Sequence, residues 1–345
     1  MTPAANAAAS VDRRAPEESG APIDCVLFDL DGVVYHGPEP ISGAAEGINF
    51  LHDQSIPVNY VTNNATRTAE VVAEHISTLG ISTTPAEVTT SAQVLAGRLA
   101  ERFGTGALIY LVGTTGLAAA LESEGLTLTH NLDEGPVAIA QGLDPGITYE
   151  SIVRACEAIT SGIEWWATNP DYSMVGPRSR VPGNGAFIDM LSKLTGAEPT
   201  VVGKPSPHMM EFAARRIGAK RPLMVGDRLD TDIEGGNSAG FETALVLTGV
   251  HDIRDALRAS PGLRPTYILP SLRGLPKLID AEDTHGSADG EHGSAGARIV
   301  DGELHLDDSA HVGAAIVQDA LRLAWEAMDR GEDVAPGNLP RRIHD

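Results

Sequence analysis

The sequence is poor in basic residues, cysteine and aromatic residues. It has 345 residues, of which 25 are Lys or Arg and 47 are Asp or Glu, so the formal net charge is −22. Because nucleic acids and anionic membranes bind basic patches, this balance predicts no nucleic-acid partner and no membrane partner. No apolar run approaches the roughly 18 residues of a membrane-spanning helix. The two cysteines, Cys25 and Cys156, have no Cys-x-x-Cys neighbour, so we expect reduced structural thiols.

The first 20 residues contain an Arg13-Arg14 pair but no apolar segment after it. A secretion signal needs such a segment. We therefore interpret residues 1–20 as a disordered leader and expect a cytoplasmic protein.

Apolar segments alternate with helical patterns along much of the chain, and the length suggests about two domains. A short apolar segment at 25–29, an amphipathic segment at 42–53 and a second apolar segment at 57–62 predict a βαβ unit with parallel strands. Further strands are predicted at 222–227, 242–249 and 266–270. The expected fold class is α/β, with a doubly wound, parallel-sheet (Rossmann-like) core formed by residues 21–97 and 199–271.

The segment 98–198 has strands and a helix of its own, and we expect it to be an α/β cap domain inserted into the core. Its predicted strands are 107–113, 136–142 and 164–168, and its predicted helix is 149–161.

Residues 272–345 differ from the rest in composition. A Gly-, Ser- and acid-rich stretch at 280–296 predicts a linker. Asp301-Gly302 between short apolar stretches predicts a hairpin, and Asp308 or Ser309 could cap a helix that runs to Met328. One hairpin and one helix bury little surface, so this small α+β appendage is expected to dock on the main body or on a partner, and a homodimer is possible.

Two carboxylates follow the first predicted strand, Asp29 and Asp31. In open α/β sheets the reactive crevice lies beyond the carboxyl ends of the strands. A carboxylate there can attack phosphorus, and a second acid can protonate the leaving alcohol and then deprotonate water. Mg²⁺ would relieve the repulsion between the two acids. The alternative is that Asp31-Gly32 simply starts a turn.

Polar residues also follow three other predicted strands or turns. The Thr62 hydroxyl and the backbone N–H groups that follow it could bind phosphate, as could Lys204 in a rigid Gly-Lys-Pro turn. Asp227 is placed to bind the metal, with Asp232 as a direct or indirect support. Taken singly, Thr62 and Asp232 could be helix caps and Lys204 a surface lysine.

The four segments "DLDGV", "TNN", "GKP" and "GDRLDTDI" resemble the four motifs of the haloacid dehalogenase superfamily of phosphotransferases. The inserted block resembles that superfamily's class IIA cap, and "ATNPD", "VPGNGA" and "TALVLTGV" are similar to its p-nitrophenyl-phosphatase branch. The resemblance covers roughly residues 22–270. It implies Asp29 as nucleophile and Asp31 as general acid/base. It implies Mg²⁺ on the Asp29 side chain, the Asp31 carbonyl and Asp227, and phosphate binding by "TNN" and Lys204, that is by the residues Thr62, Asn63, Asn64 and Lys204.

The resemblance further implies a phosphoric monoester hydrolase acting on a small phosphorylated metabolite, with glycerol 3-phosphate as the favoured substrate. Phosphoglycolate, pyridoxal phosphate and nucleotides remain alternatives. So do a phosphotransferase that uses another acceptor and a non-catalytic scaffold, although a scaffold would not need all of these acids and the lysine.

Substrate choice is expected to come from the cap, because the phosphate site is generic. The candidates in its loop-rich region are Asn169, Asp171, Arg178 and Arg180. Each could instead be an ordinary solvated loop residue. The sequence "GNSAG" at 236–240 matches a serine-hydrolase elbow, but it follows a helical segment and precedes a strand, so we interpret it as a turn.

Overall fold

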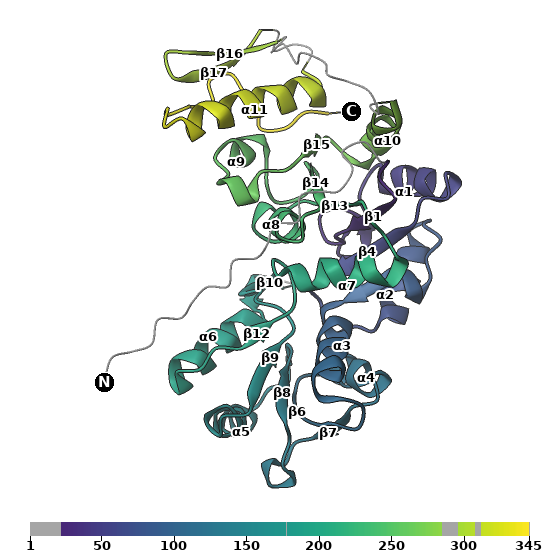
Figure 1. Cartoon of the computed structure of the whole chain (residues 1–345), viewed down its shortest axis with the longest axis vertical. Helices are drawn as coiled ribbons and strands as arrows, with labels where there is room; N and C mark the ends of the chain where they lie inside the picture. Colours follow the sequence, from purple (N-terminus) through teal and green to yellow (C-terminus); the bar gives the residue numbers. More distant parts are fainter. Residues whose placement is uncertain (1–21, 177, 285–295, 308–311, 345) are drawn as a thin grey trace.

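The computed structural model describes residues 22–176, 178–284, 296–307 and 312–344. The predicted leader, most of the predicted linker, and the proposed caps Asp308 and Ser309 lie outside these residues. Figure 1 shows three parts along the long axis, with the C-terminal elements at one end, a central sheet, and a second sheet at the other end.

The central sheet, which we call the core, has six parallel strands in the order β15-β14-β13-β1-β4-β5. The prediction of a doubly wound sheet is confirmed, because the strands are added on one side of β1 as β4 and β5 and on its other side as β13, β14 and β15. The short edge strand β5 was not predicted. The strands are β1 (Cys25–Phe28), β4 (Val58–Thr62), β5 (Val88–Thr90), β13 (Pro222–Gly226), β14 (Glu242–Val246) and β15 (Tyr267–Leu269).

Helices cover both faces of the core because alternate side chains of β1 point to opposite sides. Val26 and Phe28 pack in a cluster with α1 and α2, whereas Leu27 packs with α3 and α7. The helices are α1 (Ala44–Asp53), α2 (Ala69–Thr78), α3 (Ser91–Phe103), α7 (Pro207–Ile217), α8 (Glu234–Ser238), α9 (Ile253–Leu257) and α10 (Leu275–Thr284). Helix α10 extends into residues that were predicted to be linker. The segment 236–240 comprises the end of α8 and the short turn that leads to β14, so it is a helix-to-strand connection, as predicted.

The second sheet, which we call the cap, has five parallel strands in the order β12-β9-β8-β6-β7. Its strand β12 lies within the segment predicted as core but pairs with β9. The elements are β6 (Leu108–Val112), α4 (Thr115–Ser123), β7 (Thr127–Thr129), β8 (Ala138–Gln141), α5 (Tyr149–Thr160), β9 (Glu164–Ala167), α6 (Asn184–Thr195) and β12 (Thr200–Val201).

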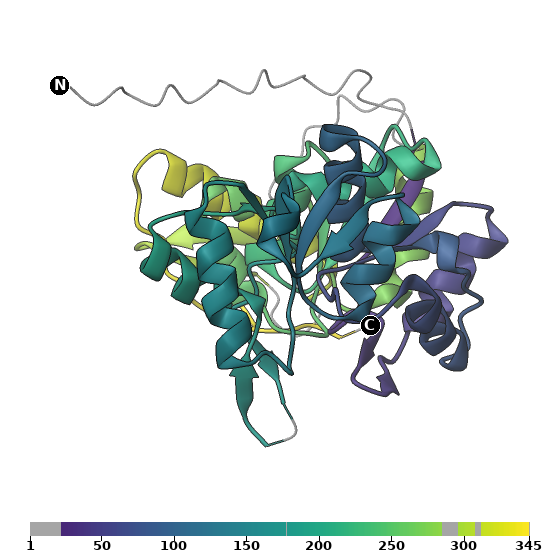
Figure 2. The same ribbon diagram turned by 90° about the horizontal axis from the view of Figure 1, so that it is seen from below.

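Two short antiparallel pairs flank these sheets. Strands β2 (Tyr35–His36) and β3 (Glu39–Pro40) follow β1, and β10 (Ser173–Val175) and β11 (Arg180–Pro182) form a hairpin in the cap. In Figure 2 this teal hairpin projects away from the cap helices.

The C-terminal hairpin is confirmed as β16 (Ala297–Val300) and β17 (Glu303–Leu306), with positive φ at Asp301 and Gly302. Helix α11 (Ala314–Asp329) begins later than predicted, with Gly313 at its N-cap. These elements dock on the core through an apolar cluster that joins them to β14, β15 and α9. Among the described helices, none is both long and apolar enough to span a bilayer.

Candidate active site

Four polar side chains from separate segments meet at the carboxyl edge of the core sheet. Asp29 follows β1, Thr62 ends β4, and Asp227 follows β13. Strands β4, β1 and β13 are adjacent and parallel, so their carboxyl ends lie at the same edge. Lys204, from the turn after β12, reaches the same place.

Lys204 lies between two carboxylates. Its Nζ donates a hydrogen bond to Asp29 Oδ1 and another, of 2.7 Å, to Asp232 Oδ1. The lysine side chain is 3% exposed, Asp29 14% and Asp232 1%. Burial alone would lower the pKa of Lys204, but the charges of Asp232 and Asp29 raise it above the ordinary value. The lysine is therefore a permanent positive charge at the end of β1.

Asp29, Asp227 and Asp232 form a cluster in which one carboxylate oxygen of each residue lies within 4.8 Å of the other two. Asp227 Oδ2 accepts a hydrogen bond of 2.7 Å from Val250 N, while its buried Oδ1 has no partner in the part of the chain that the structure describes. Burial raises the pKa of both Asp29 and Asp227, and the neighbouring charge of Asp232 raises them further. An orphaned carboxylate oxygen in a cluster of three acids fits a hard divalent cation such as Mg²⁺.

Asp232 is held by two contacts that explain its burial. Besides the lysine, it accepts a hydrogen bond of 3.1 Å from Arg228 N. Gly226 lies so close that a Cβ there would be 2.1 Å from the Cβ of Asp232. Asp232 is thus fixed against the end of β13, beside both Lys204 and Asp227.

Asp31 lies apart from this cluster. Its side chain is 73% exposed, and Oδ1 is 3.4 Å from His36 Nδ1. The structure therefore brings Asp29, Asp227 and Asp232 together, whereas the Asp31 carboxylate is exposed to solvent.

The three residues of "TNN" have different surroundings. Thr62 Oγ1 accepts a hydrogen bond from Asn64 N at 3.1 Å, and the exposed Asn64 side chain accepts hydrogen bonds from Thr66. The Asn63 side chain instead binds both backbone polar groups of Lys204. Asn63 Oδ1 accepts a hydrogen bond of 2.8 Å from Lys204 N, and Asn63 Nδ2 donates one of 3.1 Å to Lys204 O. Its side-chain amide is thus engaged in holding the lysine.

Two of the four cap candidates reach this site. Asn169 is buried, and its Nδ2 donates to the main-chain oxygen of Asn63 at 2.8 Å. Asp171 Oδ1 accepts a hydrogen bond of 3.3 Å from Asn63 Nδ2, and burial raises the pKa of Asp171 above its ordinary value. Arg178 and Arg180 lie in the exposed part of the β10–β11 hairpin, where Arg180 Nε donates to Ser173 Oγ.

The sequence did not single out the buried amides behind Asn169. Asn184 Nδ2 donates to Asn169 O at 2.9 Å, Gln141 Nε2 donates to Asn184 Oδ1 at 3.2 Å, and Trp165 Nε1 donates to Gln141 Oε1 at 2.9 Å. Together with Asn63, these side chains form a continuous hydrogen-bonded chain from the cap to Lys204. Each of these amides donates and accepts, so the orientation of every one is fixed by its neighbours.

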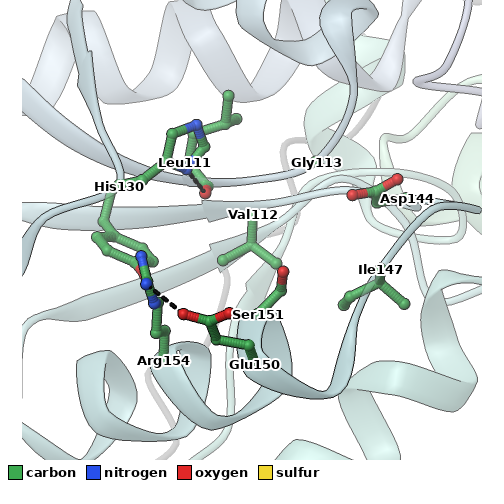
Figure 3. Close-up of a pocket in the computed structure, with 10 residues that line it drawn as sticks. Leu111, Val112, Gly113, His130, Asp144, Ile147, Glu150, Ser151 and Arg154 are labelled. Carbon is green, nitrogen blue, oxygen red and sulfur yellow. Dashed lines mark hydrogen bonds and ion pairs between the residues drawn. The ribbon is translucent and has the colours of Figure 1, made fainter.

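A separate cavity of about 220 Å³ lies in the cap, between the end of β6 and the start of α5 (Figure 3). Arg154 pairs with Glu150 at its wall, and His130 Nδ1 lies 3.0 Å from Leu111 O. None of the predicted site residues lines this cavity, which distinguishes it from the carboxylate cluster.

Comparison with known families and curated proteins agrees with this geometry. Residues 26–127 match a model described as haloacid dehalogenase-like hydrolase, and residues 201–275 match a second model of the same kind. The chain is 38% identical over 307 residues to the D-glycerol 3-phosphate phosphatase of Mycobacterium tuberculosis, covering 88% of this chain and 86% of that one. It is 39% identical over 256 residues to an acid sugar phosphatase of Staphylococcus saprophyticus, covering 74% and 97% of the two chains.

Solved structures give the same picture. The M. tuberculosis glycerol phosphate phosphatase in complex with magnesium superimposes with a TM-score of 0.79 at 36% identity, covering 91% of this chain and 92% of that one. The p-nitrophenyl phosphatase of Archaeoglobus fulgidus gives a TM-score of 0.69 at 31% identity, covering 76% and 100%. The first match extends over nearly the whole chain, whereas the second covers about three quarters of it.

Proposed function

Because the chain belongs to the haloacid dehalogenase-like hydrolases, we propose that it hydrolyses glycerol 3-phosphate through an aspartyl-phosphate on Asp29. It is a phosphoric monoester hydrolase for small phosphate esters, and Mg²⁺ is its cofactor. The observation that carries the proposal is the position of the Lys204 ammonium between Asp29 and Asp232, with Asp227 beside them.

In the first step, an Asp29 carboxylate oxygen attacks phosphorus and the bond from phosphorus to the glycerol oxygen breaks. The departing oxygen takes a proton from Asp31, so glycerol leaves neutral. The exposed position of Asp31 supports this role, since the leaving group must depart toward solvent. In the second step, Asp31 takes a proton from water as the water oxygen attacks phosphorus. The bond to Asp29 then breaks and inorganic phosphate is released.

The charge that builds on the phosphoryl oxygens needs fixed positive groups around it. Lys204 supplies one, and Thr62 with the backbone N–H groups of Asn63 and Asn64 could supply hydrogen bonds. Asp29, Asp227 and the Asp31 carbonyl, with Asp232 in support, would hold Mg²⁺, which would supply further positive charge at this site. Lys204 also keeps Asp29 oriented in the absence of substrate.

The cap would recognise the glycerol end of the substrate. Asn169 and Asp171 both contact Asn63, and Asp171 would offer an acceptor to a substrate hydroxyl. Arg178 and Arg180 would have to approach from the hairpin to contribute. The choice of glycerol 3-phosphate over a sugar phosphate rests on the match to the D-glycerol 3-phosphate phosphatase, which covers 88% of this chain, whereas the match to the acid sugar phosphatase covers 74%.

The test is phosphate release with Mg²⁺ from glycerol 3-phosphate, phosphoglycolate, pyridoxal phosphate, a nucleoside monophosphate and p-nitrophenyl phosphate. Asp29→Asn and metal-free protein should release none, and Asp53→Asn, an exposed aspartate at the end of α1, should behave like wild type. Equal yields of phosphate and glycerol support hydrolysis, whereas less phosphate than glycerol would indicate transfer to another acceptor. If another substrate is hydrolysed best, the choice of glycerol 3-phosphate is wrong, but the aspartyl-phosphate mechanism is not affected.

The cytoplasmic location and a homodimer also remain proposals. The cysteines Cys25 and Cys156 are both free thiols, which agrees with a reducing compartment. Size-exclusion chromatography with light scattering would decide the oligomeric state.

A further inference from the structure

Residues 339–342, near the C-terminus, lie against the loop that holds Asp227. This loop, residues 247–254, runs from β14 into α9. Its Val250 N donates to Asp227 Oδ2 at 2.7 Å, and His251 N donates to Asp227 O at 3.1 Å. The loop therefore fixes both the side chain and the backbone of one proposed metal ligand.

Gly249 brings this loop into direct contact with Asp227. A Cβ at position 249 would lie 1.9 Å from Asp227 Oδ2, so only glycine allows the approach. On the same side, Thr248 Oγ1 donates to Gly32 O at 2.7 Å, which connects the loop to the turn after Asp31. A small displacement of residues 248–250 would therefore change the positions of groups at both the β1 and β13 ends.

The opposite side of the loop is held by the C-terminal segment 339–342. Arg342 donates from Nη1 to Leu247 O and from Nη2 to Gly249 O, the second at 2.7 Å. Arg341 Nη1 donates to Asp252 Oδ2 at 2.6 Å, and Arg341 O accepts from Ile253 N at 2.9 Å. Arg254 Nε donates to Leu339 O at 3.0 Å. The loop is thus held between Asp227 and the C-terminal segment.

The C-terminal segment is itself anchored. Leu339 is 0% exposed and Ile343 is 7% exposed, and both belong to the apolar cluster that α11 forms with β14 and α9. The arginines consequently extend from a packed base. The bonds of Arg342 to two main-chain carbonyls constrain the loop more tightly than a contact between two mobile surface side chains would.

We propose that residues 339–342 are a positioning element of the magnesium site, acting through the 247–254 loop on Asp227. The appendage would then serve the catalytic core of its own chain. Groups that orient a metal ligand typically change metal affinity by about 10–100-fold when removed. Arg342 acts through one intervening loop, so we expect an effect near the lower limit. The inference rests on the proposed function only in taking Asp227 as a Mg²⁺ ligand.

The test is calorimetric titration of Mg²⁺ into full-length, metal-free protein, without substrate. For Arg342→Leu we expect a Kd for Mg²⁺ about tenfold higher than that of wild type. Arg342→Lys keeps the charge and can reach one of the two carbonyls, so its Kd should lie between the two. The matched control is Arg330→Leu, which removes an exposed arginine of the same appendage whose side chain pairs with Glu332. Its Kd should equal that of wild type.

The outcomes separate this inference from the proposed function. If wild type and Asp227→Asn bind Mg²⁺ equally, the assignment of Asp227 as a ligand is wrong. If Asp227→Asn loses binding but Arg342→Leu binds like wild type, the positioning role is wrong. Tighter binding by Arg342→Leu would also refute it, because loss of a positive charge alone would favour the cation. If Arg342→Leu does not fold, an unchanged Kd in Arg342→Lys would refute the role.

Discussion

The Asn63 side chain forms two hydrogen bonds with the backbone of Lys204, which lies 141 residues away in the sequence. One amide thereby fixes both the N–H and the C=O of the residue whose ammonium contacts Asp29. Asn63 O in turn accepts hydrogen bonds from Asn169 of the cap and Ser91 at the start of α3. Lys204 is therefore positioned from both the core and the cap.

Replacing Asn63 with alanine should lower kcat by about 10²-fold, because a lysine displaced by about 1 Å no longer meets the phosphoryl group correctly. Phosphate release at saturating Mg²⁺ measures the effect. The matched control is Asn64→Ala, which removes an exposed side chain that accepts hydrogen bonds from Thr66 in its own turn. A loss of kcat in Asn64→Ala as large as that in Asn63→Ala would contradict the importance of the bonds to Lys204.

The metal-free protein should lose stability as the pH rises. The pKa values of Asp29 and Asp227 are raised by burial and by Asp232, so the native state retains protons that the unfolded chain has released. Stability then falls as the pH rises above the ordinary aspartate pKa of about 4 and through the raised values. Urea unfolding in EDTA at several pH values measures this slope.

Two comparisons test the cause of that slope. Asp227→Asn removes one of the acids and should give a flatter dependence on pH. Adding Mg²⁺ should stabilise wild type more at higher pH, because the cation needs the ionised carboxylates. Equal slopes in wild type and Asp227→Asn would show that the carboxylate cluster is not responsible.

The amide chain in the cap gives a further prediction. Gln141→Leu removes the link between Trp165 and Asn184 and leaves buried hydrogen-bonding groups unpaired, at a cost of about 1–3 kcal/mol in the free energy of unfolding. We also expect a lower kcat, since Asn169 loses its support. Gln318→Leu is the matched control, because the Gln318 amide is buried in α11 and has no partner among the described residues. It should be neutral or stabilising, and destabilisation equal to that of Gln141→Leu would refute the role of the chain.

Docking of the appendage should depend on Trp325. This side chain is 6% exposed, its Nε1 donates to Ala256 O at 3.1 Å, and Arg264 lies over its ring. Trp325→Ala should lower the free energy of unfolding by about 3–5 kcal/mol. Trp325→Phe keeps most of the packing and should cost less. An unchanged unfolding midpoint in Trp325→Ala would show that α11 does not stabilise the core.

The sequence predicted those parts of the fold that depend on local patterns. Buried strands such as β1 and β13 are continuous apolar segments, and the acids that follow them mark the carboxyl edge of the sheet. Strands β7 and β12 have 3 and 2 residues, which is too short to show the alternation of apolar and polar residues that indicates a strand. The start of α11 was predicted too early because Asp308 and Ser309 are good caps, yet Gly313 occupies the N-cap position.

Contacts between distant segments could not be predicted. The "TNN" segment indicated a phosphate-binding turn, but the bonds of the Asn63 side chain to Lys204 depend on where the second half of the core folds back. Gln141 occupies a strand position that an apolar residue would suit, and its partner Asn184 is 43 residues away. Arg342 is 93 residues from Gly249. No spacing or motif connects these residues in the sequence.

The most direct test of the central claim is to trap the phosphorylated enzyme. A substrate with a good leaving group, such as p-nitrophenyl phosphate, needs little help from a general acid. With this substrate, Asp31→Asn should still form the aspartyl-phosphate but should hydrolyse it much more slowly than wild type does. Acid quenching followed by peptide mass spectrometry should then find one added HPO₃ on Asp29 with Mg²⁺ present. If wild type releases phosphate but neither protein carries HPO₃ on Asp29 at any quench time, the aspartyl-phosphate mechanism is contradicted.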